Sequence, residues 1–186
     1  MPDERFPRLV SLACHDLRTP LATIYGFART LNRVEEQDER TARFLGMIEE
    51  AAEQMTDLLD GLAAAARIEA GRWEPILREV DTLELARAGG AGVEADGTGA
   101  EVRTEAEAVE RALRALAGAA LRHGPVDRVA WHVDGAQLEL SPVTAEAAPV
   151  LAGDAPRDLG SLVARMVIEE LGGSIELDGE ILRVQL

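Results

Sequence analysis

The stretch SLACHDLRTPLATIYGFARTL, residues 11–31, decides how the first part of this chain folds. Its apolar residues recur every three or four positions, which is the spacing of one face of an amphipathic α-helix. His15, Asp16 and Thr19 stand among them, and at 3.6 residues per turn His15 and Thr19 lie on one side of the helix. The stretch therefore predicts a helix that carries a titratable imidazole on its surface, beside a carboxylate and a hydroxyl.

Outward from this stretch, the pattern predicts two long helices. The first covers residues 4–34, and a polar turn leads to a second over residues 38–70, with Asp38 as a possible N-cap and Gly71 as its end. Two such helices joined by a short loop form an antiparallel hairpin, which leaves part of each apolar stripe uncovered. Pairing of two chains into a four-helix bundle covers the rest, so we expect a homodimer.

Residues 72–186 have a different pattern, which predicts a second domain. The expected elements are two hairpins that turn at Asp-Gly pairs, over residues 128–140 and 174–186, and two helices, over residues 105–123 and 158–171. The glycine-rich, acidic stretch 89–100 predicts a loop. Together these elements predict an antiparallel or mixed sheet covered by helices on one face. The expected fold class is α+β: a helical hairpin over residues 1–71, dimerising into a four-helix bundle, and an α/β sandwich over residues 72–186.

Composition and charge exclude several classes of partner. The chain has 34 acidic residues against 19 basic ones, all of them arginine, for a net charge of −15. Neither nucleic acid nor an anionic membrane is therefore an expected partner. The single cysteine, Cys14, cannot form an internal disulfide, and no apolar run predicts a membrane-spanning helix or a signal peptide. We expect a cytoplasmic protein, and Met1, so close to the first helix, favours a stand-alone chain.

The segment HDLRTPL, residues 15–21, resembles the phosphoacceptor box of bacterial two-component sensor histidine kinases. The resemblance extends through LLD at 58–60 and RIEAG at 67–71, which are similar to the second helix of that family's dimerisation and phosphotransfer hairpin. By position, it implies that His15 is the phosphorylated residue and Asp16 the base that assists transfer. It implies that Thr19 helps to hydrolyse a partner's phosphoaspartate. The face on which a receiver domain docks would then consist of Arg18, Ala22, Tyr25 and Arg29.

Residues 72–186 look like a shortened copy of the same family's ATP-binding domain, a Bergerat-like α/β sandwich, with its functional residues missing. Where the family has two asparagines that hold Mg²⁺ and phosphates, this chain has Ala115 and Ala119, and alanine offers a metal ion no ligand. The first glycine box is replaced by SPVTAEA at 141–147, and Gly160 remains from the second. Only Arg122 keeps a possible phosphate contact. We therefore expect this chain to bind no nucleotide and no metal ion, with Mg²⁺ in the acidic pocket of the partner receiver domain.

The leading hypothesis is a histidine phosphotransfer protein of a two-component phosphorelay, a phosphotransferase that exchanges phosphoryl groups with receiver aspartates at His15 and lacks autokinase activity. An active or divergent kinase, or a phosphatase of a receiver, is the first alternative. A non-catalytic dimeric module that binds receivers is the second. The other two histidines, His123 and His132, have no acidic or cysteine neighbours at metal-ligand spacing, so they predict no metal site.

Overall fold

The computed structural model describes residues 5–32, 38–155 and 157–186. They fall into two compact units, Met1–Gly71 and Arg72–Leu186. Within the described ranges, no helix is both long enough and apolar enough to cross a bilayer.

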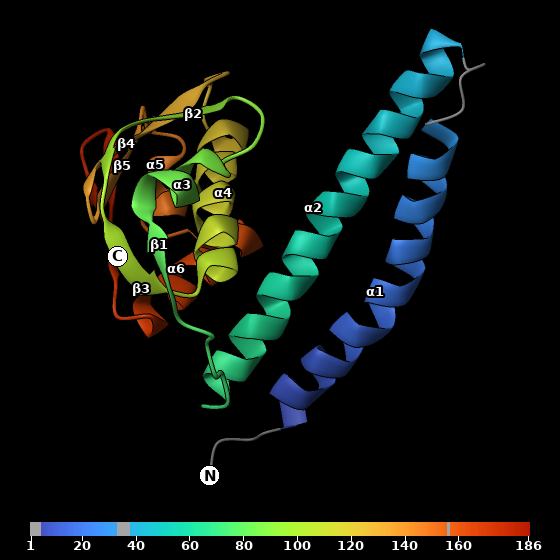
Figure 1. The fold of residues 1–186 in the computed structure, drawn as a ribbon, viewed down its shortest axis with the longest axis horizontal. Helices are drawn as coiled ribbons and strands as arrows, with labels where there is room; N and C mark the ends of the chain where they lie inside the picture. Colours follow the sequence, from blue (N-terminus) through green and yellow to red (C-terminus); the bar gives the residue numbers. More distant parts are fainter. Residues whose placement is uncertain (1–4, 33–37, 156) are drawn as a thin grey trace. The chain divides into compact units, whose positions relative to one another are not determined.

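The first unit is the predicted antiparallel helical hairpin. Helix α1 (Arg5–Asn32) runs through Pro20 without a break, and helix α2 (Glu39–Glu69) packs along it (Figure 1). The predicted N-cap is confirmed, because the Asp38 carboxylate accepts hydrogen bonds from the Thr41 backbone N–H and hydroxyl, both at 2.9 Å. Gly71, with φ +61°, follows the last turn of α2, in the left-handed conformation in which many helices end.

The hairpin buries one apolar stripe of α1 and leaves another exposed. Cys14, Leu21 and Ala28, spaced seven residues apart, are all buried. A parallel stripe three residues further along, Leu17, Ile24 and Leu31, keeps the same spacing, yet these side chains are 53%, 52% and 50% exposed. Helix α2 has exposed apolar side chains too: Phe44, Met47, Ile48, Met55 and Leu58. A repeat of seven with two apolar positions is the pattern of coiled-coil helices, and here the hairpin covers one of the two positions of α1 and leaves the other exposed.

The second unit has a five-stranded mixed sheet and a separate two-stranded one. The order in the large sheet is β2-β4-β5-β7-β6, in which β2 is parallel to β4 and every other pair is antiparallel. Its strands are β2 (Val93–Gly99), β4 (Val129–Gly135), β5 (Gln137–Ser141), β6 (Ser174–Asp178) and β7 (Ile181–Gln185). Strands β1 (Arg78–Asp81) and β3 (Glu101–Thr104) form the small antiparallel sheet. Both predicted hairpins, β4-β5 and β6-β7, are confirmed.

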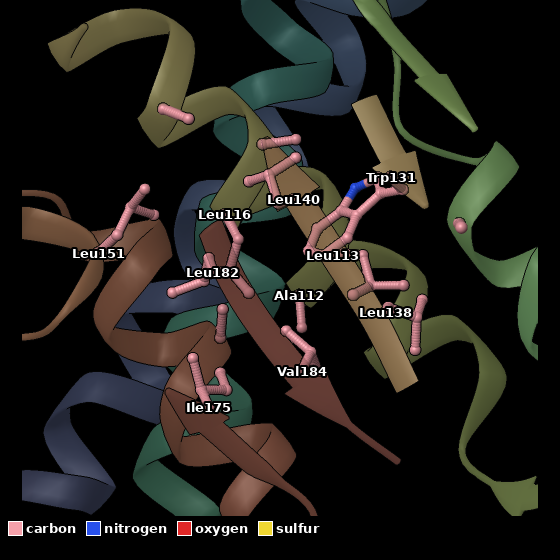
Figure 2. Close-up of a cluster of buried hydrophobic side chains, with 14 of the residues drawn as sticks. Ala112, Leu113, Leu116, Trp131, Leu138, Leu140, Leu151, Ile175, Leu182 and Val184 are labelled. Atoms are coloured by element: carbon pink, nitrogen blue, oxygen red, sulfur yellow. The ribbon is translucent and has the colours of Figure 1, made fainter. Parts of the chain in front are cut away.

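Helices cover one face of the large sheet, as the sequence predicts (Figure 1). They are α3 (Thr82–Arg87), α4 (Ala106–His123), α5 (Ala148–Leu151) and α6 (Leu159–Glu170). Figure 2 shows Leu113 and Leu116 of α4 together with Trp131, Leu140 and Leu182 of the strands, and all five are fully buried. The inner face of α4 consists mainly of alanine and leucine, which lets the helix lie close to α6 and the sheet.

The prediction of a loop over residues 89–100 is wrong, because most of this stretch is strand β2, on the edge of the large sheet. Gly97 shows why the glycines of this stretch do not indicate a loop. It has φ +104°, and a Cβ there would collide with the backbone of Val133 on the neighbouring strand. Glycine is thus required by a close approach of two strands, whereas the sequence pattern indicated a flexible connection.

Candidate functional site

His15 lies on the exposed side of α1, at an open depression of about 560 Å³. The depression is lined by His15, Arg18, Thr19, Ala22 and Thr23. These positions are three or four residues apart, so successive turns of one helix face supply the lining. The structure therefore brings His15 and Thr19 together as predicted, with a cationic side chain between them in sequence. The chemical roles of these side chains stay predictions.

The positively charged side chain in this depression, Arg18, is held by a contact with α2. The Arg18 guanidinium (Nη2) donates a hydrogen bond to the Asp60 carboxylate (Oδ1) at 2.5 Å, and both side chains are partly exposed. In the sequence, Asp60 stands out only as part of the LLD segment, which predicts no contact for its carboxylate. Residues 42 positions apart meet only because the hairpin folds back on itself, so no local spacing could have identified the pair.

Tyr25 and Arg29, predicted to belong to a docking face, join a second polar link between the helices. The Arg29 guanidinium (Nη1) donates to the Tyr25 hydroxyl at 3.1 Å, and that hydroxyl donates to the Glu53 carboxylate of α2 at 3.0 Å. The guanidinium carbon lies 5.8 Å from the centre of the tyrosine ring, within the range of a cation–π interaction. Together with Arg18 and Ala22, these residues form one stripe along α1, because their positions differ by three or four.

Of the two residues next to His15 in sequence, the structure describes the side chain of Cys14 but not that of Asp16. Asp16 belongs to α1, but its side chain lies outside the part of the structure that is described, so its predicted role as a base stays a prediction. Cys14 is 1% exposed, so it is a small packing residue between the helices of the hairpin. Burial raises the pKa of its thiol, and the nearby Arg18 charge only partly opposes this effect.

In the second unit, the positions that the resemblance assigns to a nucleotide are packed with apolar groups. Ala119 of α4 is fully buried, and Ala115, one turn earlier, is half-buried. Gly160 lies in the first turn of α6. Among the residues whose placement is described, no group of three or more acidic, histidine or cysteine side chains could hold a metal ion.

The segment that replaces the first glycine box is part of the core. Val143, Ala147, Val150 and Leu151 are at most 4% exposed, and α5 packs against α4. Two side chains of α6 hold the segment by its backbone carbonyls. The Ser161 hydroxyl donates to the carbonyl of Val150 at 3.2 Å, and the Arg165 guanidinium donates to that of Leu151 at 3.0 Å.

Arg122, for which the sequence leaves a possible phosphate contact, forms an ion pair with Asp158. Its guanidinium donates two hydrogen bonds to one oxygen of Asp158, from Nη2 at 2.7 Å and from Nε at 3.2 Å. The Asp158 side chain is only 7% exposed. Burial alone would raise the pKa of Asp158, but the hydrogen bonds and charge of Arg122, with the Ser161 backbone N–H, hold it below its usual value.

Both remaining histidines have acidic partners that the sequence analysis missed. His123 Nε2 lies 3.2 Å from the same Asp158 oxygen. His132 Nδ1 lies 2.7 Å from the Asp96 carboxylate on the neighbouring parallel strand, and that hydrogen bond raises the pKa of His132. Strand pairing brings together residues 36 positions apart, which neighbour spacing cannot reveal. Each of these two histidines has one carboxylate partner.

Comparison with known proteins gives matches to histidine kinases. Residues 8–71 match the family His Kinase A (phospho-acceptor) domain. The probable sensor histidine kinase TcrY of Mycobacterium tuberculosis (strain ATCC 25618 / H37Rv) is 35% identical over 80 residues, 42% of this chain and 16% of TcrY. The sensor protein KdpD of M. tuberculosis (strain CDC 1551 / Oshkosh) is 33% identical over 141 residues, 66% of this chain and 16% of KdpD. The matches thus span 16% of the length of each relative.

Solved structures share the fold over both units. Acinetobacter baumannii histidine kinase AdeS superposes with a TM-score of 0.52 at 19% identity, covering 92% of this chain and 96% of AdeS. Full-length ShkA in complex with AMPPNP gives a TM-score of 0.54 at 20% identity, covering 96% of this chain and 44% of ShkA. The hairpin followed by a helix-covered sheet is therefore the fold of a phosphoacceptor hairpin and a kinase ATP-binding domain. The sequence match over residues 8–71 makes the hairpin similar to the His Kinase A (phospho-acceptor) domain, and over both units the chain is similar in fold to two-component histidine kinases.

Proposed function

We propose that this chain is a histidine phosphotransfer protein, in which His15 accepts a phosphoryl group from the phosphoaspartate of a receiver domain and donates it to the aspartate of another. The observation that carries the proposal is the place of His15, exposed on α1 within the phospho-acceptor match and at the depression that Arg18 and Thr19 share. An exposed acceptor fits a macromolecular donor, because a receiver must bring its own acidic pocket against the helix.

The transfer needs positioning and electrostatic stabilisation more than covalent catalysis by the protein. An unprotonated ring nitrogen of His15 attacks the phosphorus, the N–P bond forms, and the bond between phosphorus and the receiver aspartate breaks, which releases the aspartate as a carboxylate. Arg18 lines the same depression, and the N–H groups that its hydrogen bond to Asp60 does not use would offset negative charge on the phosphoryl oxygens. Asp16 would orient the imidazole or take its proton, and the Mg²⁺ ion would be held by the receiver.

The second unit supports a source of phosphate outside this chain. The residues at the nucleotide positions do not fit ATP with Mg²⁺, because Ala115 and Ala119 offer no oxygen and the segment with Val150 and Leu151 is packed in the core. Arg122 is engaged with Asp158. These observations favour phosphotransfer over autophosphorylation.

Pairing of two hairpins into a four-helix bundle is part of the proposal. The exposed stripe of Leu17, Ile24 and Leu31 repeats every seven residues, beside Phe27, which is 67% exposed. Each stripe needs a second apolar surface to leave water, and an identical hairpin supplies one of matching length. A homodimer would carry two copies of His15, with a receiver docked on each stripe of Arg18, Ala22, Tyr25 and Arg29.

The proposal is tested by incubating the full chain with receiver domains carrying radiolabelled phosphoaspartate. We expect acid-labile label on the wild-type chain and none on His15→Ala. The matched control is His132→Ala, which removes an exposed histidine of the second unit and should accept label as the wild type does. Absence of label from every receiver, or equal labelling of His15→Ala, would contradict the proposal.

A second candidate activity, hydrolysis of the receiver's phosphoaspartate, is favoured by Thr19, whose side chain lines the depression one turn from His15. A hydroxyl there could position water for attack on phosphorus. Under this candidate, Thr19→Ala abolishes the release of inorganic phosphate from the receiver but leaves transfer to His15 unchanged. Equal phosphate release by Thr19→Ala and wild type would exclude it.

A further inference from the structure

The end of α4 and the start of α6 are joined by one buried carboxylate. Asp158, the N-cap of α6, is 8% exposed. One of its oxygens lies at hydrogen-bond distance from Arg122 Nη2 (2.7 Å), Arg122 Nε (3.2 Å) and His123 Nε2 (3.2 Å). The other accepts from the Ser161 backbone N–H at 2.9 Å. Two side chains of α4 and the first turn of α6 thus converge on the same acid.

These donors are the kinds of group that proteins use to bind an external anion: a guanidinium, an imidazole and a backbone N–H at a helix N-terminus. In this chain the anion is an internal carboxylate. Because the guanidinium takes Asp158 with two of its N–H groups, the charge of Arg122 is already offset within the fold. Removing either partner would leave the other without its counter-charge next to the core.

Ser161 connects this ion pair to the packed segment 143–151. Its backbone N–H donates to Asp158, and its hydroxyl donates to the carbonyl of Val150 in α5. Ser161 itself is fully buried, as is Leu151 beside Val150. On the other side of the segment, the Val143 backbone N–H donates to the carbonyl of Glu180 at 2.7 Å, which ties the segment to the β6-β7 turn.

We propose that Asp158, Arg122 and Ser161 form a clasp that keeps residues 143–151 packed against α4 and α6 with no ligand bound, so that the second unit has a single closed conformation. The inference deepens the proposed function and rests on it in one respect: the chain works without nucleotide. Residues 143–151 are then a fixed part of the core. A fixed second unit would offer receivers an unchanging surface.

The test is amide hydrogen exchange on the full chain, read by mass spectrometry for peptides covering residues 148–152 and 161–164. We expect both peptides to be protected in the wild type, equally with and without ATP and Mg²⁺. Asp158→Asn keeps the size and an N-cap oxygen but removes the charge, and it should accelerate exchange in both peptides about tenfold. The matched control is Asp154→Asn, an exposed aspartate of the neighbouring loop, which should leave exchange unchanged.

Arg122→Gln provides a second variant in case Asp158→Asn unfolds the unit. The Arg122 side chain is 57% exposed, so its loss leaves the packing and the Asp158 cap in place. We expect the same local acceleration, with peptides from β4 and β5 unchanged. Unprotected wild-type peptides, protection that requires added ATP and Mg²⁺, or exchange in both clasp variants equal to that of Asp154→Asn would each overturn the clasp.

Transfer to His15 is measured on the same samples, so that the two proposals fail separately. If no receiver labels His15 but the exchange pattern is as expected, the phosphotransfer function is wrong and the clasp stands. If His15 is labelled by receivers and residues 148–152 exchange like an unfolded peptide, the clasp is wrong and the phosphotransfer function stands.

Discussion

His15, Arg18 and Thr19 in the hairpin face an open depression, whereas in the second unit one of the two alanines at the metal-ligand positions and the segment that replaces the first glycine box are packed in the core. Ala119 is fully buried there, and Leu151 packs in the core between helices and sheet (Figure 2). The difference has a physical reason. A site that meets another protein needs an exposed side chain, and one histidine on a helix is sufficient. A nucleotide needs a maintained cavity with several polar groups, and such a cavity can be replaced by apolar packing that stabilises the fold.

The largest expected effect tests whether the exposed apolar stripe of the hairpin is a dimer interface. Ile24→Glu places a carboxylate in the exposed apolar stripe of α1, once in each chain. If this stripe is the dimer interface, burying two carboxylates costs several kcal/mol per ion, and the dimer dissociates. Light scattering at micromolar concentration should then give the mass of one chain. Thr30→Glu, also exposed on α1, is the control and should stay dimeric; a dimeric Ile24→Glu would show that the stripe is covered by something else.

The next effect tests whether the replaced glycine box is part of the core. Leu151→Ala deletes a fully buried side chain, and we expect the free energy of unfolding of the second unit to fall by about 2 to 5 kcal/mol. Leu159→Ala removes the same atoms from a side chain that is 45% exposed, so its effect should be below about 1 kcal/mol. Urea denaturation followed by circular dichroism measures both. Equal effects of the two variants would mean that residues 148–151 do not pack as described.

A smaller effect comes from restoring the amide that the resemblance leads one to expect. Ala119→Asn forces a polar side chain into a fully buried position, which should destabilise the second unit by about 2 to 4 kcal/mol through crowding and an unsatisfied amide. Ala115→Asn, at a half-buried position, should cost less than half as much. Thermal unfolding of both variants, with and without ATP and Mg²⁺, provides the measurement. Stabilisation of Ala119→Asn by nucleotide would reveal a cavity that the wild-type packing conceals.

The smallest effect is a pH dependence. Because the pKa of Asp158 is lower in the folded chain than in the unfolded one, its ionised form stabilises the fold at pH values above the unfolded pKa, about 3.9 for an aspartate. This contribution is lost as the pH falls through the folded pKa. We expect wild type to exceed Asp158→Asn in unfolding free energy by about 1 kcal/mol between pH 5 and 7. This difference in unfolding free energy should shrink below pH 4. A difference that stays constant down to pH 3 would mean that it comes from packing and not from the charge of Asp158.

Much of the fold could be predicted because local patterns determine it. The three-to-four-residue spacing of apolar residues, the N-cap at Asp38 and the Asp-Gly turns each rely on neighbours in sequence, and the structure confirms the elements that they predict. Strand β2 could not be predicted, because its Gly97 is explained by the backbone of Val133 and its Gly99 by the side chain of Asp81, both of which are remote in sequence. Its parallel pairing with β4 likewise depends on a crossover through α4 that no local pattern indicates.

For the candidate site, the sequence supplied the helix face but not its partners. His15, Thr19 and Ala22 share one face through helical spacing alone, and they line one depression. The contacts of Arg18 with Asp60, and of Arg122 with Asp158, join residues 42 and 36 positions apart. Arg122 keeps a possible phosphate contact when only its residue type and its position in the resemblance are considered. Its tertiary partner gives it a different role, which a single sequence cannot reveal.

The account is tested most directly by the source of the phosphate on His15. The full chain is incubated in parallel with radiolabelled ATP and Mg²⁺ and with a set of receiver domains carrying labelled phosphoaspartate, and the labelled histidine is identified by mass spectrometry. We predict label on His15 from at least one receiver and none from ATP. Label on His15 from ATP, lost in His15→Ala and retained in His132→Ala, would contradict the account, because the second unit would then have to bind and use a nucleotide.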